Sequence, residues 1–286
     1  MSRVPETLPL LVGLAVLGAA VLHASWNALT KSLDDQLVAF AGLDVASGLA
    51  CLVLLPFVAT PAASSLPYLG ASIVIHVIYK VMLMQSYRLG DLGRVYPIAR
   101  GTAPLLVGLL AVPFANEPLT IPELLGMAAV TGGIISLADF RAASSRHRMA
   151  VPFALATGAC IAAYSLSDGL GARHSGAVLG YLAWLLVVES VPIPLYCAIW
   201  QRERLSGQWR ATWRRAGPAG VLSVVAYGIV LWAQTRGPLG TVAALRETGV
   251  IVAALMGWVF LHERFGRREA LSALAVAAGA ALLVAH

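Results

Sequence analysis

Ten long apolar runs joined by short connections dominate this sequence of 286 residues. A helix needs roughly 20 apolar residues to cross the hydrocarbon core of a bilayer, and each run is close to that length. The sequence therefore predicts an all-α membrane protein with ten transmembrane helices. We expect these helices at residues 8–29, 37–59, 66–87, 95–114, 120–137, 151–171, 177–200, 218–235, 241–262 and 270–285.

The composition supports the same class. Hydrophobic residues make up 59% of the chain and charged residues only 12%, whereas a soluble domain carries about 25% charged residues. The mean hydropathy is +0.79. A water-soluble globule cannot hide this much apolar surface, because much of its surface must face water. A large soluble domain, a disordered chain and a coiled coil are therefore excluded.

Basic residues concentrate in alternate connections, which predicts that this side faces the cytosol of an inner cell membrane and that both termini lie on the other side. The net charge of +6 is then a topology signal, and we expect no nucleic-acid partner. The basic side carries Lys31, Arg88, Arg94, Arg141, Arg146, Arg148, Arg202, Arg204, Arg210, Arg214, Arg215, Arg264, Arg267 and Arg268, and the opposite side carries Arg3, Arg173 and Arg236.

No signature of an enzyme, metal site or cofactor site occurs in the sequence. The chain has no glycine-rich phosphate loop, no His-Glu-x-x-His pair and no Gly-x-Ser-x-Gly elbow. Cys51, Cys160 and Cys197 lie in apolar runs without metal-ligand spacing, so we expect them to be buried thiols. Without an ATP site, any transport would be driven by a gradient.

The two halves of the chain resemble each other. Because each half has five spans, an odd number, the second half must enter the membrane with opposite orientation, as in inverted-repeat transporters. The predicted organisation is a first repeat at 1–140, a basic cytoplasmic linker at 141–150 and a second repeat at 151–286. An offset of 146 residues pairs Arg100 with Arg246, Phe114 with Phe260, Glu117 with Glu263, Glu123 with Glu269 and Gly133 with Gly279.

These features resemble the drug/metabolite transporter superfamily, and its EamA-like branch in particular. In that branch the fourth and ninth helices end in a "GERL"-like sequence, and here the ends read NEPL (116–119) and HERF (262–265), which keep the Glu but not the Gly. Gly126, Gly133 and Gly279 match in the helices that follow. The resemblance implies a transporter whose helices 1, 3, 4, 6, 8 and 9 line a central cavity, with members that export amino acids or other metabolites.

Polar residues within the spans form stripes at helical spacing, on these same helices. A charge deep in the membrane is costly and by default marks a pathway or a partner. Lys80, Arg100 and Arg246 would attract a carboxylate or phosphonate, and the aromatic side chains would hold an apolar or ammonium part. The predicted substrate-binding residues are His23, Trp26, Asn27, Tyr79, Lys80, Tyr96, Arg100, Tyr164, Ser165, Asp168, Trp232, Arg246 and Glu247.

The same charges also allow a structural interpretation. Arg246 would pair with Glu247 or Asp168, and Lys80 with Asp44, as ion pairs between helices. His76 fits either interpretation, Asp44 and Glu189 are typical of polar contacts that hold helices together, and Glu117 and Glu263 are expected to have structural roles at helix ends.

The depth of the two arginines adds a constraint. Arg100 and Arg246 each lie about five residues inside spans that start from opposite faces, which places them roughly 15 Å apart in depth. We therefore expect each arginine to serve one face of an alternating-access cycle, with Arg100 on the inward side and Arg246 on the outward side.

The sequence as a whole favours a secondary active transporter of small polar metabolites, either amino acids or related organic anions. Export follows from the family resemblance alone. The expected partners are a small-molecule substrate, the lipid bilayer and a coupling proton or counter-substrate, with a monomeric or homodimeric state. The alternative is a non-transporting membrane sensor or assembly subunit.

Overall fold

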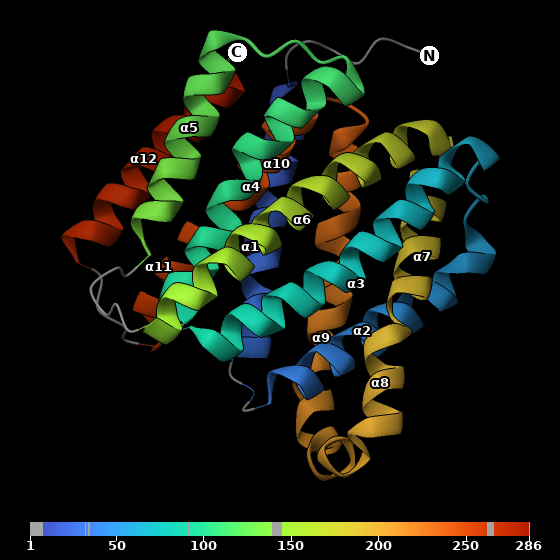
Figure 1. Ribbon diagram of the computed structural model, residues 1–286. Coiled ribbons are helices and arrows are strands. Elements are labelled where there is room, and N and C mark those ends of the chain that lie inside the picture. The colour runs from blue at the N-terminus through green and yellow to red at the C-terminus, as the bar shows by residue number, and fades with distance from the viewer. Residues whose placement is uncertain are drawn as a thin grey trace.

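Helices account for almost the whole of the computed structural model, which describes residues 8–31, 33, 35–90, 92–138, 145–261 and 266–285 (Figure 1). No strand occurs among these residues. The helices are α1 (Leu10–Lys31), α2 (Gln36–Leu54), α3 (Leu66–Leu89), α4 (Leu92–Ala115), α5 (Ile121–Ser136), α6 (Ser145–Ser175), α7 (Val178–Glu189), α8 (Pro192–Trp200), α9 (Arg202–Gln234), α10 (Leu239–Glu247), α11 (Gly249–Leu261) and α12 (Arg267–Ala285), with short 3₁₀ turns at Leu55–Phe57 and Ala63–Ser65.

The predicted all-α membrane fold is confirmed. Within the described residues, nine helical segments are long and apolar enough to cross a membrane. The fifth predicted span is α5, an apolar helix of 16 residues. At 1.5 Å per residue its length is about 24 Å, which is shorter than a hydrocarbon core of about 30 Å. A capping box at Thr120 and Glu123 fixes where this short helix begins.

The eighth predicted span differs most from the sequence-based expectation. Helix α9 begins at Arg202, 16 residues before the predicted start at 218, and runs unbroken for 33 residues. The five arginines that were expected in the connection before this span are therefore helical. The apolar pattern marks only the part of a helix that meets lipid, so it missed the polar first half. At about 50 Å, α9 is much longer than the hydrocarbon core.

The basic linker predicted at 141–150 is helical from Ser145 onward, where α6 begins. Residues 139–144 lie outside the described residues, as do residues 262–265 with Glu263. The division of the chain into two repeats stays a prediction.

The seventh and ninth predicted spans are each broken into two helices. Helix α7 ends at Glu189 and α8 begins at Pro192, because a proline nitrogen has no N–H and its ring clashes with the preceding turn. Helix α10 ends at Glu247, and Thr248 separates it from α11. Just after this break, the backbone passes close to α1, because a Cβ at Gly249 would lie 2.9 Å from the carbonyl oxygen of Ala20.

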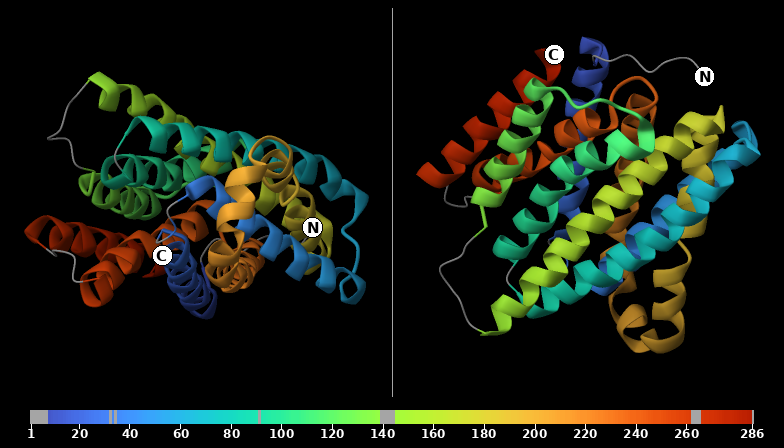
Figure 2. Two further views of the ribbon diagram at one scale, coloured as in Figure 1. Left: turned by 90° about the horizontal axis from the view of Figure 1, so that it is seen from below. Right: turned by 45° about the horizontal axis from the view of Figure 1, so that its top comes forward.

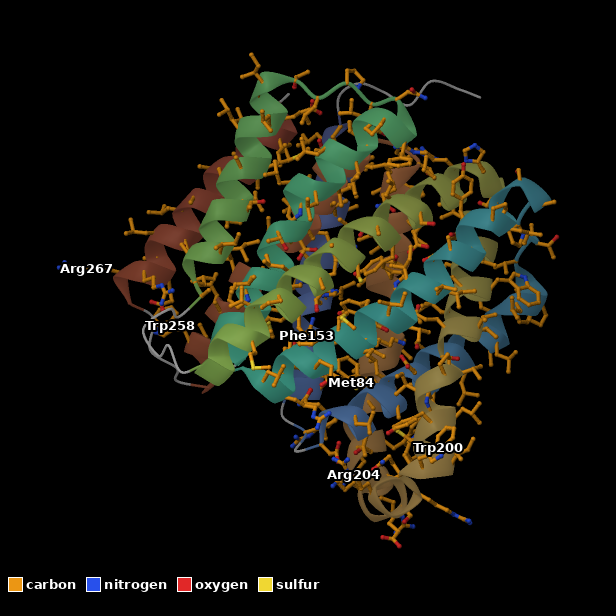
Figure 3. All side chains as sticks on the ribbon, viewed as in Figure 1. Met84, Phe153, Trp200, Arg204, Trp258 and Arg267 are labelled. Carbon is orange, nitrogen blue, oxygen red and sulfur yellow. The ribbon has the colours of Figure 1, made fainter. Side chains whose placement is uncertain are left out.

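Helices of the first half pack mainly against helices of the second half. Helix α3 lies along α6, α1 along α9, α4 against α10, and α5 along α12 at one edge of the bundle (Figures 1 and 2). Exchange of the two predicted repeats maps each of these pairs onto itself or onto another of them. The start of α1 and the end of α12 lie at one end of the bundle, and the turn between α8 and α9 lies at the other end (Figure 1). Trp200, the last residue of α8, and Arg204, in the first turn of α9, both lie at that end (Figure 3).

One close backbone approach between the halves is the crossing of α4 and α10 at two glycines. A Cβ at Gly240 would lie 2.7 Å from Cα of Gly108 and 2.6 Å from Cε of Met127. This crossing brings the following part of α10 toward the preceding part of α4, where Arg246 and Arg100 lie. The glycine pair therefore sets the distance between two buried arginines.

We expect Gly240→Ala to destabilise the protein by about 2 kcal/mol, because overpacking of a close contact costs roughly 1–3 kcal/mol. The melting temperature of the purified protein in detergent measures this. Gly132→Ala is the matched control, since a Cβ at Gly132 meets no atom within 4 Å. Equal melting temperatures for the two variants would contradict a tight crossing.

Candidate functional site

A cavity of about 150 Å³ lies between seven helices: α1, α2, α3, α4, α6, α7 and α9. Four of these belong to the predicted first half and three to the second. A cavity of about this volume, engineered into another protein, holds one benzene molecule. The cavity is therefore large enough for one small molecule, and both halves of the chain build its wall.

The lining extends to one end of the bundle. Asn27 lies near the end of α1 and Tyr87 near the end of α3, while Phe40 and Tyr96 each lie in the second turn of α2 and α4. These helix ends join the 1–2 and 3–4 connections, which belong to the side predicted to be cytoplasmic. The cavity thus reaches toward the arginine-rich end of the molecule.

One buried charge cluster lies in the cavity wall and is here named the lysine cluster: Lys80, Asp44 and Glu189. The Lys80 ammonium donates to both carboxylate oxygens of Asp44 at 2.8 Å and lies 3.0 Å from Oε1 of Glu189. All three side chains are less than 10% exposed. The cluster joins α2, α3 and α7, and with two carboxylates and one ammonium it carries one excess negative charge.

A second buried cluster, the arginine cluster, consists of Arg100, Arg246 and Glu247. Nε of Arg100 lies 2.8 Å from Oε2 of Glu247, and Arg246 donates to Oε1 of Glu247 at 2.9 and 3.1 Å. Arg246 also donates to the Ser165 hydroxyl at 3.2 Å. With two guanidinium groups and one carboxylate, this cluster carries one excess positive charge. Only Arg100 of the three lines the cavity.

The arginine cluster also determines which ring nitrogen of His23 carries the proton. Nη2 of Arg100 lies 2.7 Å from Nε2 of His23. A guanidinium group only donates hydrogen bonds, so Nε2 of His23 must accept and the ring proton must sit on Nδ1. The ring of Trp26 meets His23 edge-on, with centroids 4.8 Å apart. His23 therefore holds Arg100 from the cavity side as a neutral acceptor.

The prediction that the two arginines lie roughly 15 Å apart in depth is wrong, because both contact the same carboxylate. Helix α4 starts at Leu92, so Arg100 lies eight residues inside it, about 12 Å along the axis. Helix α10 starts at Leu239 and places Arg246 about 10 Å inside. Both arginines thus reach the middle of the bundle, which removes the basis for assigning one to each face.

Aromatic rings surround the space beside the lysine cluster. The His76 ring stacks on Tyr164 with centroids 4.0 Å apart, and Tyr79 meets Tyr164 edge-on at 5.6 Å. The guanidinium of Arg100 lies 5.9 Å from the ring centre of Tyr96. The ring of Tyr227 also lines the cavity, and its hydroxyl donates to Asp168 behind it.

A network around Arg173 on α6 lies at the opposite end of the bundle. Arg173 contacts Oε1 of Glu117 at 2.6 Å and donates to the carbonyl oxygens of Gln234 and Gly237 at 2.7 and 2.8 Å. The other oxygen of Glu117 accepts from the backbone N–H of Leu239 at 2.8 Å. This latch ties the α4–α5 connection, α6 and the α9–α10 turn together. The role expected for Glu117 was structural, at a helix end.

The structure places the predicted site residues in three groups. Ser165, Arg246 and Glu247 form a layer behind Arg100, and Asp168 bonds to the hydroxyls of Tyr181 and Tyr227. Trp232 lies elsewhere: it packs in an apolar cluster and its ring centre is 5.5 Å from the Arg236 guanidinium. The remaining eight line the cavity: His23, Trp26, Asn27, Tyr79, Lys80, Tyr96, Arg100 and Tyr164.

Two carboxylates in the cavity wall were predicted only as contacts between helices. Asp44 and Glu189 lie directly beside Lys80 and face the cavity. The available signal was that each is an acid in the middle of an apolar run, in corresponding spans of the two halves. His76 lines the cavity as well, with Nδ1 3.0 Å from both oxygens of Ser72.

The described residues contain no group of three His, Cys, Asp or Glu side chains that could hold a metal ion. Cys51, Cys160 and Cys197 are free thiols, and Cys51 and Cys197 are buried. The chemical resources of the cavity are therefore its two charge clusters and its aromatic wall.

Comparisons with known proteins bear on this architecture. One solved crystal structure is similar in fold, with a TM-score of 0.75 and 16% sequence identity over 95% of this chain and 97% of its own. No curated protein matches the chain. Residues 148–285 match the model of the EamA-like transporter family. This stretch contains α7 to α12 and nearly all of α6, so the second half of the chain is similar to the EamA-like transporter family.

Proposed function

We propose that this protein is a secondary active transporter that exports small polar metabolites across the inner cell membrane by alternating access. The observation that carries the proposal is the cavity, which lies between both halves of the chain and contains the buried charges of Lys80, Arg100, Asp44 and Glu189. Charges buried within membrane spans mark substrate or ion pathways by default. The family match supports transport in general.

The two clusters suggest the substrate class. The lysine cluster has one excess negative charge and the arginine cluster one excess positive charge, and both reach the same small cavity. A molecule with an ammonium and a carboxylate group would complement both. Amino acids have this charge pattern, and related organic anions would use the arginine side alone.

Alternating access is supported by the unequal ends of the cavity. The lining reaches the arginine-rich end, whereas the latch of Arg173 and Glu117 closes the opposite end. If the arginine-rich end faces the cytosol, as the positive-inside rule suggests, this conformation faces inward. An exporter would collect its substrate in this state. The two halves would then be inverted repeats that exchange roles when the cavity reopens on the other side.

The first experiment identifies a substrate and tests transport. Purified protein is screened by thermal shift against amino acids, organic acids and phosphonates, because a ligand at 100 times its Kd adds about 2.7 kcal/mol of stability. Hits are then tested as labelled solutes in proteoliposome counterflow. Saturable counterflow supports transport. Binding without counterflow would instead favour the non-transporting sensor.

We expect Arg100→Ala to weaken substrate binding by about 10- to 100-fold, since a hydrogen bond to a charged group contributes roughly 1.5–3 kcal/mol. The apparent affinity in counterflow measures this. Arg204→Ala is the control, because Arg204 is 55% exposed and pairs with Asp35 outside the lining of the cavity. An affinity in Arg100→Ala equal to that of the control would remove Arg100 from the binding site.

A further inference from the structure

Lys80 occupies all of its hydrogen-bonding capacity on the two carboxylates of the lysine cluster. An ammonium group has three N–H donors, and the three shortest contacts of Nζ are 2.8, 2.8 and 3.0 Å, to Asp44 Oδ1, Asp44 Oδ2 and Glu189 Oε1. Each carboxylate oxygen of Asp44 accepts one hydrogen bond from Lys80. Oε2 of Glu189 lies 4.0 Å from Nε2 of His76, which is too far for a hydrogen bond.

The cluster is short of one positive charge. With both acids ionised and the neighbouring His76 ring neutral, these three groups, each less than 10% exposed, hold two negative charges and one positive charge. An uncompensated charge is expensive in a low-dielectric interior, and a second cation near it is strongly attracted. The arginine cluster does not neutralise the carboxylates of the lysine cluster, because Arg100 already contacts Glu247 and His23.

The surroundings suit an organic cation. Rings of His76, Tyr79, Tyr164 and Tyr227 lie at this part of the cavity wall. Aromatic ring faces attract ammonium groups, and they also provide the apolar surface that the rest of an organic molecule needs. A hydrated metal ion would not gain from such a wall.

We propose that Glu189, with Asp44 beside it, is the binding subsite for a primary ammonium group of the transported molecule. The ammonium takes the Oε2 side of Glu189 and completes the charge of the lysine cluster, with the tyrosine rings packed on its carbon chain. Lys80 stays in place between the two carboxylates. This inference rests on the proposed function, because it names the group that the transporter recognises.

The test uses three ligands of similar size that differ in charge: benzylammonium, benzamide and benzoate. The melting temperature of the full-length protein in detergent is measured at millimolar concentrations of each. We expect benzylammonium to raise it by about 5 °C near saturation, with no comparable shift for benzamide. The benzylammonium shift is expected to disappear in Glu189→Gln and to be at least halved in Asp44→Asn.

Glu123→Gln provides the matched control, because Glu123 is also a buried carboxylate but caps α5 outside the cavity, a position where glutamine also serves. Should the Glu189 variant fail to fold, the comparison of the three ligands on the unaltered protein still decides. No shift from benzylammonium, an equal shift from benzamide, or a shift that survives in Glu189→Gln would overturn the subsite.

The outcome is separable from that of the proposed function. If the protein shows counterflow of a solute but benzylammonium does not change its melting temperature, transport is supported and the subsite is rejected. Benzylammonium binding that depends on Glu189, in a protein without counterflow of any solute, would keep the subsite and remove transport.

Discussion

Glu247→Gln is expected to lower the melting temperature by roughly 10 °C, the largest effect of any single change to the buried charges. The substitution leaves Arg100 and Arg246 facing each other without a carboxylate, and breaking a buried ion pair in this way costs about 3–5 kcal/mol. Each kcal/mol corresponds to roughly 2–4 °C for a protein of about this size. Glu247 is fully buried, so bulk water does not reach this position to solvate the two guanidinium groups that lose their partner.

A second substitution in the same cluster should restore part of the stability that Glu247→Gln loses. Removing Arg246 together with Glu247, as Gln at both positions, restores the original excess of one positive charge, so this double variant should melt several degrees above Glu247→Gln alone. Glu203→Gln, an exposed change at the start of α9, should melt like the unaltered protein. A Glu247→Gln variant within about 2 °C of the unaltered protein would show that the arginines do not depend on this carboxylate.

Breaking the latch should open the closed end of the bundle. Arg173→Ala removes one ion pair and two hydrogen bonds to carbonyl oxygens between α6 and the α9–α10 turn. If these contacts together contribute about 2 kcal/mol to the closed state, the population of the open state rises about 30-fold. A cysteine at position 166 reports on this, because Leu166 is 8% exposed and packs against Leu239 and Ala243 on the closed side.

The labelling rate of Leu166→Cys by a membrane-impermeant maleimide is measured with and without Arg173→Ala, in a background that lacks Cys51, Cys160 and Cys197. We expect at least a tenfold faster reaction in the latch variant. Arg236→Ala, near the same end but outside the latch, should leave the rate unchanged. Equal rates with and without Arg173 would mean that apolar packing alone closes this end.

The sequence alone predicts the part of the site that depends on residue type and on spacing along one helix. Lys80 and Arg100 stand out because a charge in an apolar run is costly, and helical spacing then brings Tyr79 and Tyr96 into the same stripe. The partners of these charges come from other helices, which spacing along one helix does not reveal. The predicted pair of Lys80 with Asp44 is present, but Glu189, which lies beside the same ammonium group, was predicted only as a contact between helices.

The prediction of how deep Arg100 and Arg246 lie in the membrane failed for a different physical reason. Apolar runs locate the lipid-facing part of a span, but depth depends on where the helix starts and whether it is broken. Helix α4 starts before its apolar run, and α10 ends within the ninth run. The polar first half of α9 was missed in the same way, since helices extend beyond the membrane wherever neighbouring helices support them.

The break between α7 and α8 has an electrostatic consequence for the lysine cluster. A helix carries a partial negative charge of about half an electron at its C-terminus, and α7 ends at Glu189 itself. The next helix would normally offset this with N–H groups at its own start, but Pro192 and Pro194 lack them. The helix dipole of α7 therefore adds to the negative potential at Glu189, and this contribution comes from the backbone and does not titrate.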